Sequence, residues 1–494
     1  MRSRARHAVL VLTGAALAAA PFTAAPPANA APSAPADSPA GVAPSDTIVV
    51  ERGGPAQTVP FTADRDGEAV ISFAASAPGV SWDREDAESA VVSIAVDGRH
   101  VTDLVVPSSD PVERSLGLGR VEQGDHEVTL QFADGGSAPA AERVTLDRTR
   151  VQMPSDADNG TDAGTAQRHA PIVAGRTGWP FGDPHQNATT DTPLLAWHET
   201  RPADAPGHRI IEYSLVWSNE DGGTDTPALM ARWGRTTDVE WVYRVEVDES
   251  GRRVDGTAVY QGPLHLTLRF TGRFEGDHPV LQTCTQNNLM CDVISPDPPL
   301  RFLLDATKTR PADRAREVVM DREPWTYRVA AQELVREGKI EQPSDPATPA
   351  VGDQRTYLFV EFAKTTGAPA GNGSAPGVAL GVRLKSDPST LYRSDHDRAD
   401  WAIDRDGAVA TTVELPEGTT AADIASIEAL RRPTGAGDNG APATVTSINR
   451  GFFLDESYLP QPSAFQWEGS VTLTPENPSA VLWRSDAAAP PAAG

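Results

Sequence analysis

The chain has 494 residues, with 68 acidic against 43 basic side chains and a formal net charge of −25 at pH 7. Such an acidic surface argues against nucleic acid and anionic membranes as partners, because both are bound through cationic patches. Only two cysteines are present, and no paired C-x-x-C motif, so a zinc-ribbon protein is also poorly supported.

The N-terminus has the pattern of a secretory signal peptide over residues 1–30. Three arginines precede an apolar run over residues 8–20, and residues 28–30 read Ala-Asn-Ala, which suits signal peptidase. No later apolar run is long enough to span a bilayer. We therefore expect a secreted, extracellular and soluble mature chain that begins near Ala31.

The next segments predict a linker and a first folded domain. Residues 31–45 are rich in Ala, Pro and Ser and are expected to be disordered. Residues 46–152 hold short alternating runs broken by Asp-Gly, Gly-Gly and Gln-Gly-Asp turns, the pattern of an antiparallel β-sandwich. Its phrases VSIAVDGRHV and LGRVEQGDHEVTLQF resemble those of carbohydrate-binding-module-like and fibronectin-like accessory domains of secreted enzymes. An inert spacer has the same pattern, so the likeness assigns no ligand.

Residues 153–167 are polar and predict an exposed linker before a central β-rich domain over residues 168–345. Two runs in that domain, residues 211–217 and 239–247, alternate with a period of two and predict strands. The connection between them, residues 219–237, is rich in Gly, Asp and Thr. A loop of that length is uncommon in a compact domain unless it is functional or disordered, and its tryptophan and two arginines argue for order.

This stretch concentrates groups able to perform chemistry on a glycan. An acid and a second carboxylate must flank a scissile glycosidic bond, and aromatic faces stack on sugar rings. The acid/base candidates are Asp221, Asp238 and Glu240, with His198 or His265 as the base of a lyase. The substrate-binding candidates are Arg232 and Arg235, which would neutralise a substrate carboxylate, and Trp217, Trp233 and Trp241. A structural salt-bridge network of Glu220, Asp221, Arg232 and Arg235 is the alternative interpretation.

The run LHLTLRF predicts a further strand with leucines on one face. Leu264, Leu266 and Leu268 share that face, which leaves His265 on a polar face. There His265 would meet the charged face of the strand over residues 238–248, if the two strands pair. Shortly after it, Cys284 and Cys291 predict one disulfide in an oxidising compartment, closing a small ring that shapes a loop more than it holds the fold.

The only strong helix pattern covers residues 325–337, with Pro324 before it and Gly338 after it. We expect it to brace a sheet. Residues 346–485 return to strand patterns and predict a C-terminal β-rich region packed on the central domain, followed by a disordered tail over residues 486–494. The acids in SDHDRADW and DRDG lack the spacing of a calcium loop. The predicted fold class is mainly β, an N-terminal sandwich plus a larger β-rich domain with one prominent α-helix.

Four segments of the central domain resemble an uncharacterised family of secreted β-rich proteins from bacteria and fungi. They are HAPIVAGR, SNEDGGTDTPALMARWGRTTDVEWVYRV, EGDHPVL and AREVVMDREPWTYRVAAQELVREGKIE. The resemblance implies a folded central domain over residues 168–341. It implies no activity.

Three functions from different classes remain. The chain has no G-x-S-x-G, H-E-x-x-H or phosphate-loop motif, which argues against a nucleophile-elbow esterase, a zincin and a nucleotide enzyme. The first function is an extracellular polysaccharide-active hydrolase or lyase, monomeric and without a cofactor. The second is a non-catalytic carbohydrate or cell-surface binding protein. The third is a metal-dependent hydrolase, with zinc or calcium, using His198, Glu199, His265, Asp277 and His278.

Overall fold

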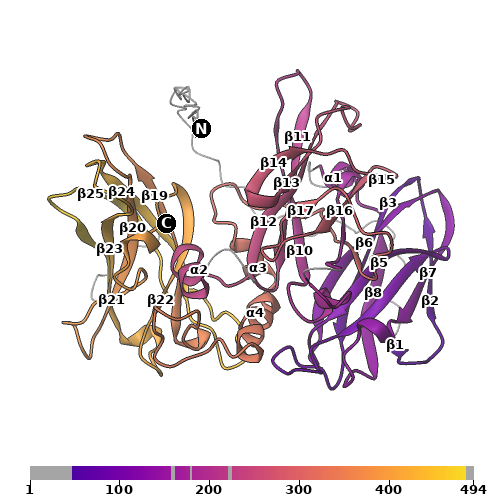
Figure 1. The fold of residues 1–494 in the computed structure, drawn as a ribbon, viewed down its shortest axis with the longest axis horizontal. Helices are drawn as coiled ribbons and strands as arrows, with labels where there is room; N and C mark the ends of the chain where they lie inside the picture. Colours follow the sequence, from indigo (N-terminus) through magenta and orange to yellow (C-terminus); the bar gives the residue numbers. More distant parts are fainter. Residues whose placement is uncertain (1–46, 157–161, 178–180, 221–224, 486–494) are drawn as a thin grey trace, which may run out of the picture. The chain divides into compact units, whose positions relative to one another are not determined.

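The computed structural model describes residues 47–156, 162–177, 181–220 and 225–485 (Figure 1). The predicted signal peptide, the first linker, the C-terminal tail and Asp221 lie outside these residues. The prediction of a mainly β protein with antiparallel sheets and few helices is confirmed. Within the described ranges, no helix combines the length and the apolar character that a bilayer crossing requires.

Eight strands form the N-terminal sandwich, in two four-stranded sheets ordered β1-β8-β3-β6 and β2-β7-β4-β5. Alternation creates its core, because every second side chain faces inward. In β7, for example, Val128, Leu130 and Phe132 are buried. The strands are β1 (Ile48–Glu51), β2 (Gln57–Ala63), β3 (Gly67–Ser76), β4 (Ala90–Val96), β5 (Arg99–Val106), β6 (Val112–Val121), β7 (Gly124–Phe132) and β8 (Arg143–Gln152).

The central region contains an antiparallel sheet in the order β10-β11-β12-β13-β14. The two strands predicted in residues 209–251 are its second and third, and Trp217 at the end of β11 pairs with Asp238 at the start of β12. A second sheet has the order β15-β16-β9-β18, with β17 beside β16. The strands are β9 (Ile172–Ala174), β10 (Pro193–Pro202), β11 (Arg209–Trp217), β12 (Asp238–Val247), β13 (Val259–Gly262), β14 (Leu266–Arg269), β15 (Phe274–Glu275), β16 (His278–Thr283), β17 (Met290–Cys291) and β18 (Arg301–Leu303).

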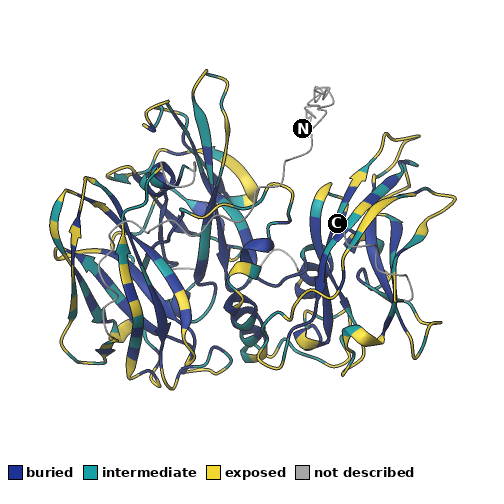
Figure 2. Ribbon diagram, turned by 180° about the vertical axis from the view of Figure 1, so that it is seen from behind, coloured by how far each residue is buried: buried dark blue, intermediate teal, exposed yellow. Residues whose placement is uncertain are grey.

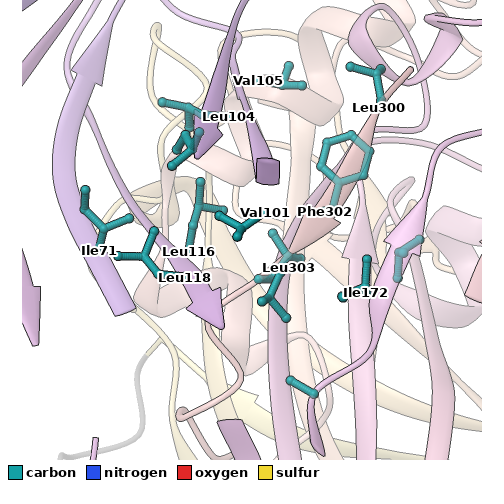
Figure 3. Packing of buried hydrophobic residues seen from close by; sticks show 14 of the residues in the cluster. Ile71, Val101, Leu104, Val105, Leu116, Leu118, Ile172, Leu300, Phe302 and Leu303 are labelled. Carbon is teal, nitrogen blue, oxygen red and sulfur yellow. The ribbon is translucent and has the colours of Figure 1, made fainter. Parts of the chain in front are cut away.

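The sandwich and the central sheets share one hydrophobic core. Figure 3 shows Leu303 of β18 beside Val101 of β5 and Leu116 of β6. Gly117 permits this approach, since a Cβ there would lie 2.7 Å from Leu303 Cγ. The predicted linker also differs: residues 163–167 belong to helix α1 (Ala163–His169), most of which is buried. Cleavage between the two parts would therefore leave fragments held together by apolar contacts.

The connection between β11 and β12 contains a helix, α2 (Thr226–Trp233), where a loop was predicted. Pro227 occupies the first turn, good helix formers follow, and Gly234 ends the helix in the left-handed conformation at φ 63°. Strand signals on both sides concealed this pattern. The predicted helix over residues 325–337 is α4 (Trp325–Arg336), preceded by α3 (Val318–Arg322).

The C-terminal region forms two more four-stranded sheets, ordered β22-β19-β24-β25 and β21-β20-β23-β26, around a core of their inward side chains. Figure 2 shows buried residues along these strands and exposed residues in the loops. Thr411 and Thr412 of β22 donate hydrogen bonds to carbonyls of α2, which ties this region to the central one. The strands are β19 (Tyr357–Thr366), β20 (Pro376–Leu384), β21 (Tyr392–Arg393), β22 (Gly407–Glu414), β23 (Ile424–Pro433), β24 (Ala443–Phe452), β25 (Trp467–Leu473) and β26 (Ser479–Arg484).

Candidate functional site

Asp238, the first residue of β12, is a buried acid with a raised pKa. Its side chain is 2% exposed, and its Oδ2 accepts a hydrogen bond from Asn288 Nδ2 at 3.1 Å. Burial raises the pKa of Asp238 well above its ordinary value, and the negative charges of Glu240 and Glu220 raise it further. Both effects favour the protonated form of Asp238.

A second buried carboxylate, Asp191, lies on the other side of Asn288. Asn288 Nδ2 donates to Asp191 Oδ1 at 2.8 Å, so one amide bridges the two acids. Arg176, fully buried, donates from Nη1 to Asp191 Oδ2 at 2.8 Å and from Nη2 to Asn288 Oδ1 at 2.7 Å. Arg176 and Asp191 thus form a fully buried ion pair beside Asn288.

The predicted disulfide between Cys284 and Cys291 is formed, with an S–S distance of 2.09 Å. Its ring contains Asn288, which is fully buried and adopts the left-handed conformation at φ 56°. The backbone N–H of Cys284 donates to the carbonyl of Leu289 at 3.0 Å, closing the turn. The ring thus aims the Asn288 amide at the two buried carboxylates.

We expect replacement of both cysteines by serine to lower the free energy of unfolding by about 2.5 kcal/mol, the loop-entropy value for a ring this short. Because the Asn288 hydrogen bond lowers the pKa of Asp238, a variant in which the ring no longer holds Asn288 should raise that pKa further. Urea unfolding and a carboxyl titration measure the two effects. A variant that keeps the pKa of Asp238 would show that Asn288 is positioned without the disulfide.

Glu240 lies two residues beyond Asp238 on the same face of β12. Its side chain is 19% exposed, and its Oε1 lies 3.9 Å from Nδ1 of His265. The same ring nitrogen lies 2.7 Å from Nε2 of Gln261. The structure therefore brings Asp238, Glu240 and His265 together at one end of the central sheet.

The strand predicted over residues 264–270 begins later than expected. Leu264 and His265 lie in a tight turn with φ values of 61° and 57°, and β14 starts at Leu266. Leu264 is 84% exposed and Leu266 is 53% exposed, so the first part of the predicted leucine face is not covered, whereas Leu268 packs against the core. The turn, not strand alternation, carries His265 to Glu240.

His198 lies apart from this cluster. It pairs with Tyr213, four residues along β11 from the partner of Asp238, a distance of about 13 Å along the strand. Its Nδ1 lies 2.7 Å from the carbonyl oxygen of Ala306, and burial lowers its pKa. The side chain is 1% exposed, which makes His198 part of the core.

The three predicted tryptophans do not form an open aromatic face. Trp217 is fully buried in the core. The guanidinium of Arg244 lies 4.5 Å from the ring centre of Trp241, and that of Arg405 lies 3.6 Å from the ring centre of Trp233. Arginines thus occupy faces that a sugar would need.

Arg232 and Arg235 lie near Trp233 at the end of α2. Arg235 is buried and donates from Nε to Glu317 Oε1 at 2.9 Å. The carbonyl of Arg232 accepts a hydrogen bond from Arg405, which precedes β22. The Arg405 contact joins α2 to the segment before β22, and Arg235 pairs with Glu317, which precedes α3 and is outside the predicted salt-bridge network.

The residues of the metal-hydrolase interpretation are dispersed. Glu199 pairs with Arg310, and His278 lies 3.1 Å from Glu68 Oε2 and 2.8 Å from the carbonyl of Ala170. Within the described part of the chain, no group of three or more His, Cys, Asp or Glu residues is arranged around a common metal position.

No family model matches the chain, and no curated protein matches it. The partial similarities among solved structures include glycoside hydrolases and carbohydrate-binding modules. A ruminal GH26 endo-β-1,4-mannanase matches with a TM-score of 0.17 and 13% identity over 28% of this chain, and the match spans 29% of that chain. The CBM35 from Cellvibrio japonicus Abf62 matches with a TM-score of 0.15 and 13% identity, over 22% of this chain and 72% of that one.

A third match is the Podospora anserina GH26-CBM35 β-(1,4)-mannanase, with a TM-score of 0.15 and 12% identity over 28% of this chain and 33% of that one. TM-scores of this size indicate no common overall fold. Membership of the uncharacterised secreted family stays a prediction from the four sequence segments, and the function is inferred below from the site.

Proposed function

We propose that the protein is an extracellular glycan hydrolase in which Asp238 is the general acid and Glu240 is the second carboxylate. The observation that carries this proposal is the raised pKa of Asp238, caused by burial and by the charge of Glu240 on the same strand face. Glycosidases use two carboxyl groups whose surroundings give them different pKa values, so that one is protonated while the other is ionised.

The chemistry follows from the two protonation states. Protonated Asp238 would donate its proton to the leaving glycosidic oxygen. Glu240 would either activate a water molecule or attack the anomeric carbon. Residues two apart on a strand have Cα atoms about 7 Å apart, which is compatible with both mechanisms and selects neither.

Two neighbours would act as positioning residues. Asn288 holds the Asp238 carboxyl through its 3.1 Å hydrogen bond, and the disulfide ring fixes Asn288. His265 lies beside Glu240 and contacts Gln261, which orients the imidazole. Neither residue needs to contact the scissile bond in this scheme.

Hydrolysis is better supported than a lyase reaction. A lyase needs a cation for the substrate carboxylate, yet Arg235 is bonded to Glu317 and to the carbonyl of Thr237. His198, one of the two bases considered, is bonded within the core. The non-catalytic binding function has less support as well, since arginines cover Trp233 and Trp241.

The proposal is tested by incubating the mature protein, starting at Ala31, with neutral and acidic polysaccharides. Release of reducing ends without new ultraviolet absorbance, unaffected by a chelator, is the expected result. Unsaturated products would identify a lyase, and turnover that stops with the chelator would identify a metal-dependent hydrolase. Glycan binding without turnover across the panel would establish the binding protein instead.

A further inference from the structure

A cavity of about 270 Å³ lies between the N-terminal sandwich and the central region, away from Asp238. Its walls come from β3, β6 and β8 on one side, from β10 and the segment after β18 on another, and from α3 and the start of α4. Its volume is near the lower end for ligand pockets, which begin at about 300 Å³. It has room for a small molecule only.

The guanidinium of Arg114 lines this cavity and is buried, with the residue 5% exposed. It lies 4.8 Å from the ring centre of Trp325. Among the described residues, it donates one long hydrogen bond, from Nη1 to the carbonyl of Val105 at 3.4 Å. Burial lowers the pKa of Arg114 to about 10, and the negative charge of Glu323 offsets only part of this effect.

The carboxylates near this cation are bonded to other groups. Glu323 accepts from Lys308 Nζ and from Trp325 Nε1. Asp305 accepts from the hydroxyl of Ser115 at 2.8 Å and from Thr307. Glu113 is paired with Arg148 at the surface. A buried arginine is normally matched by a carboxylate in hydrogen-bond contact, and no carboxylate in the described part of the chain makes such a contact with Arg114.

We infer that this cavity binds a small hydroxylated carboxylate, such as a sugar acid, whose carboxylate pairs with Arg114. The planar guanidinium favours bidentate contact with a carboxylate. Ser72 and Gln152 provide polar groups for hydroxyls in the same wall, and Trp197 provides an apolar surface. This site is separate from Asp238 and Glu240 and does not depend on the proposed hydrolysis.

Calorimetry with sodium D-glucuronate, with D-glucose as the uncharged probe, tests the inference on the mature protein. We expect glucuronate to bind and glucose not to bind. Arg114→Met should weaken glucuronate binding at least about tenfold, the effect of losing one charged hydrogen bond. Arg143→Met changes an exposed arginine on β8 of the same sandwich that does not line the cavity, so it is the matched control and should bind as the parent protein does.

Two further measurements separate ligand binding from a structural role. Arg114→Met should keep or raise the melting temperature without ligand, because a buried cation lacking a counter-ion is removed. Ala196→Phe should fill the cavity and abolish binding while Arg114 remains. A lowered melting temperature of Arg114→Met with unchanged glucuronate affinity would overturn the inference. So would equal binding of glucose, binding of inorganic phosphate in place of glucuronate, or binding that survives Ala196→Phe.

Discussion

Asp238→Asn and Glu240→Gln should each lower glycan turnover by about 10²- to 10⁴-fold, the usual contribution of a general acid or base. Each change keeps the size of the side chain and removes the proton transfer or the charge. The quantity to measure is kcat/KM on the glycan found in the polysaccharide panel. A loss below tenfold for both variants would remove these residues from the mechanism.

The matched control is Glu246→Gln, on the same strand. Glu246 Oε1 lies 2.7 Å from His208 Nδ1, away from Asn288 and Asp238, so this change should leave turnover intact.

The stability of Asp238→Asn distinguishes a catalytic role of Asp238 from a purely structural one. The raised pKa of Asp238 means that its contribution to stability is present at low pH and is lost as pH rises through the folded-state value. Asp238→Asn should therefore be at least as stable as the parent above neutral pH.

In the parent protein, Glu333 should make the free energy of unfolding fall by about 3 kcal/mol as pH rises. Glu333→Gln should remove this fall. Glu333 is fully buried on α4, where its Oε2 accepts from Trp82 Nε1 at 2.9 Å. Burial raises its pKa from 4.5 to about 7, partly offset by the charge of Arg336. A rise of that size corresponds to about 3 kcal/mol between the two protonation states.

The sign follows from the raised pKa. Protonated Glu333 stabilises the fold below about pH 4.5, and this contribution is lost as pH rises to about 7. Glutamine stays neutral at all pH values. The free energy of unfolding of the variant, relative to that of the parent, should therefore rise by about 3 kcal/mol from about pH 4 to about pH 8. Urea unfolding at both pH values measures this difference. Glu122→Gln, which changes an exposed residue, is the control. If the free energies of unfolding of the parent and of Glu333→Gln changed with pH in parallel, the expected effect of burial would be contradicted.

Local patterns predicted much of the fold. Alternation located the strands over residues 209–217 and 238–247, and the flanking proline and glycine located the helix over residues 325–336. The helix α2 was missed because its pattern lies inside a Gly- and Asp-rich connection. At the turn before β14, edge position and positive φ values overrode the leucine alternation.

The candidate site was predictable in its residue types but not in its arrangement. Sequence reasoning selected Asp238, Glu240 and His265, which the structure brings together. It missed Asn288, Asp191 and Arg176, because contacts between positions 50 or more apart leave no local pattern. It also offered Trp217 as a sugar platform, although its alternation is equally that of a core residue, and Trp217 is in the core.

The most direct test of the central claim is infrared difference spectroscopy of the parent protein against Asp238→Asn at neutral pH. A protonated carboxyl group has a carbonyl stretch that a carboxylate lacks, so subtraction isolates the state of this one acid. The predicted result is a protonated carboxyl band in the parent that is missing from the variant, because burial beside Glu240 favours the protonated form. Identical spectra in that region would show that Asp238 is ionised and could not serve as the acid.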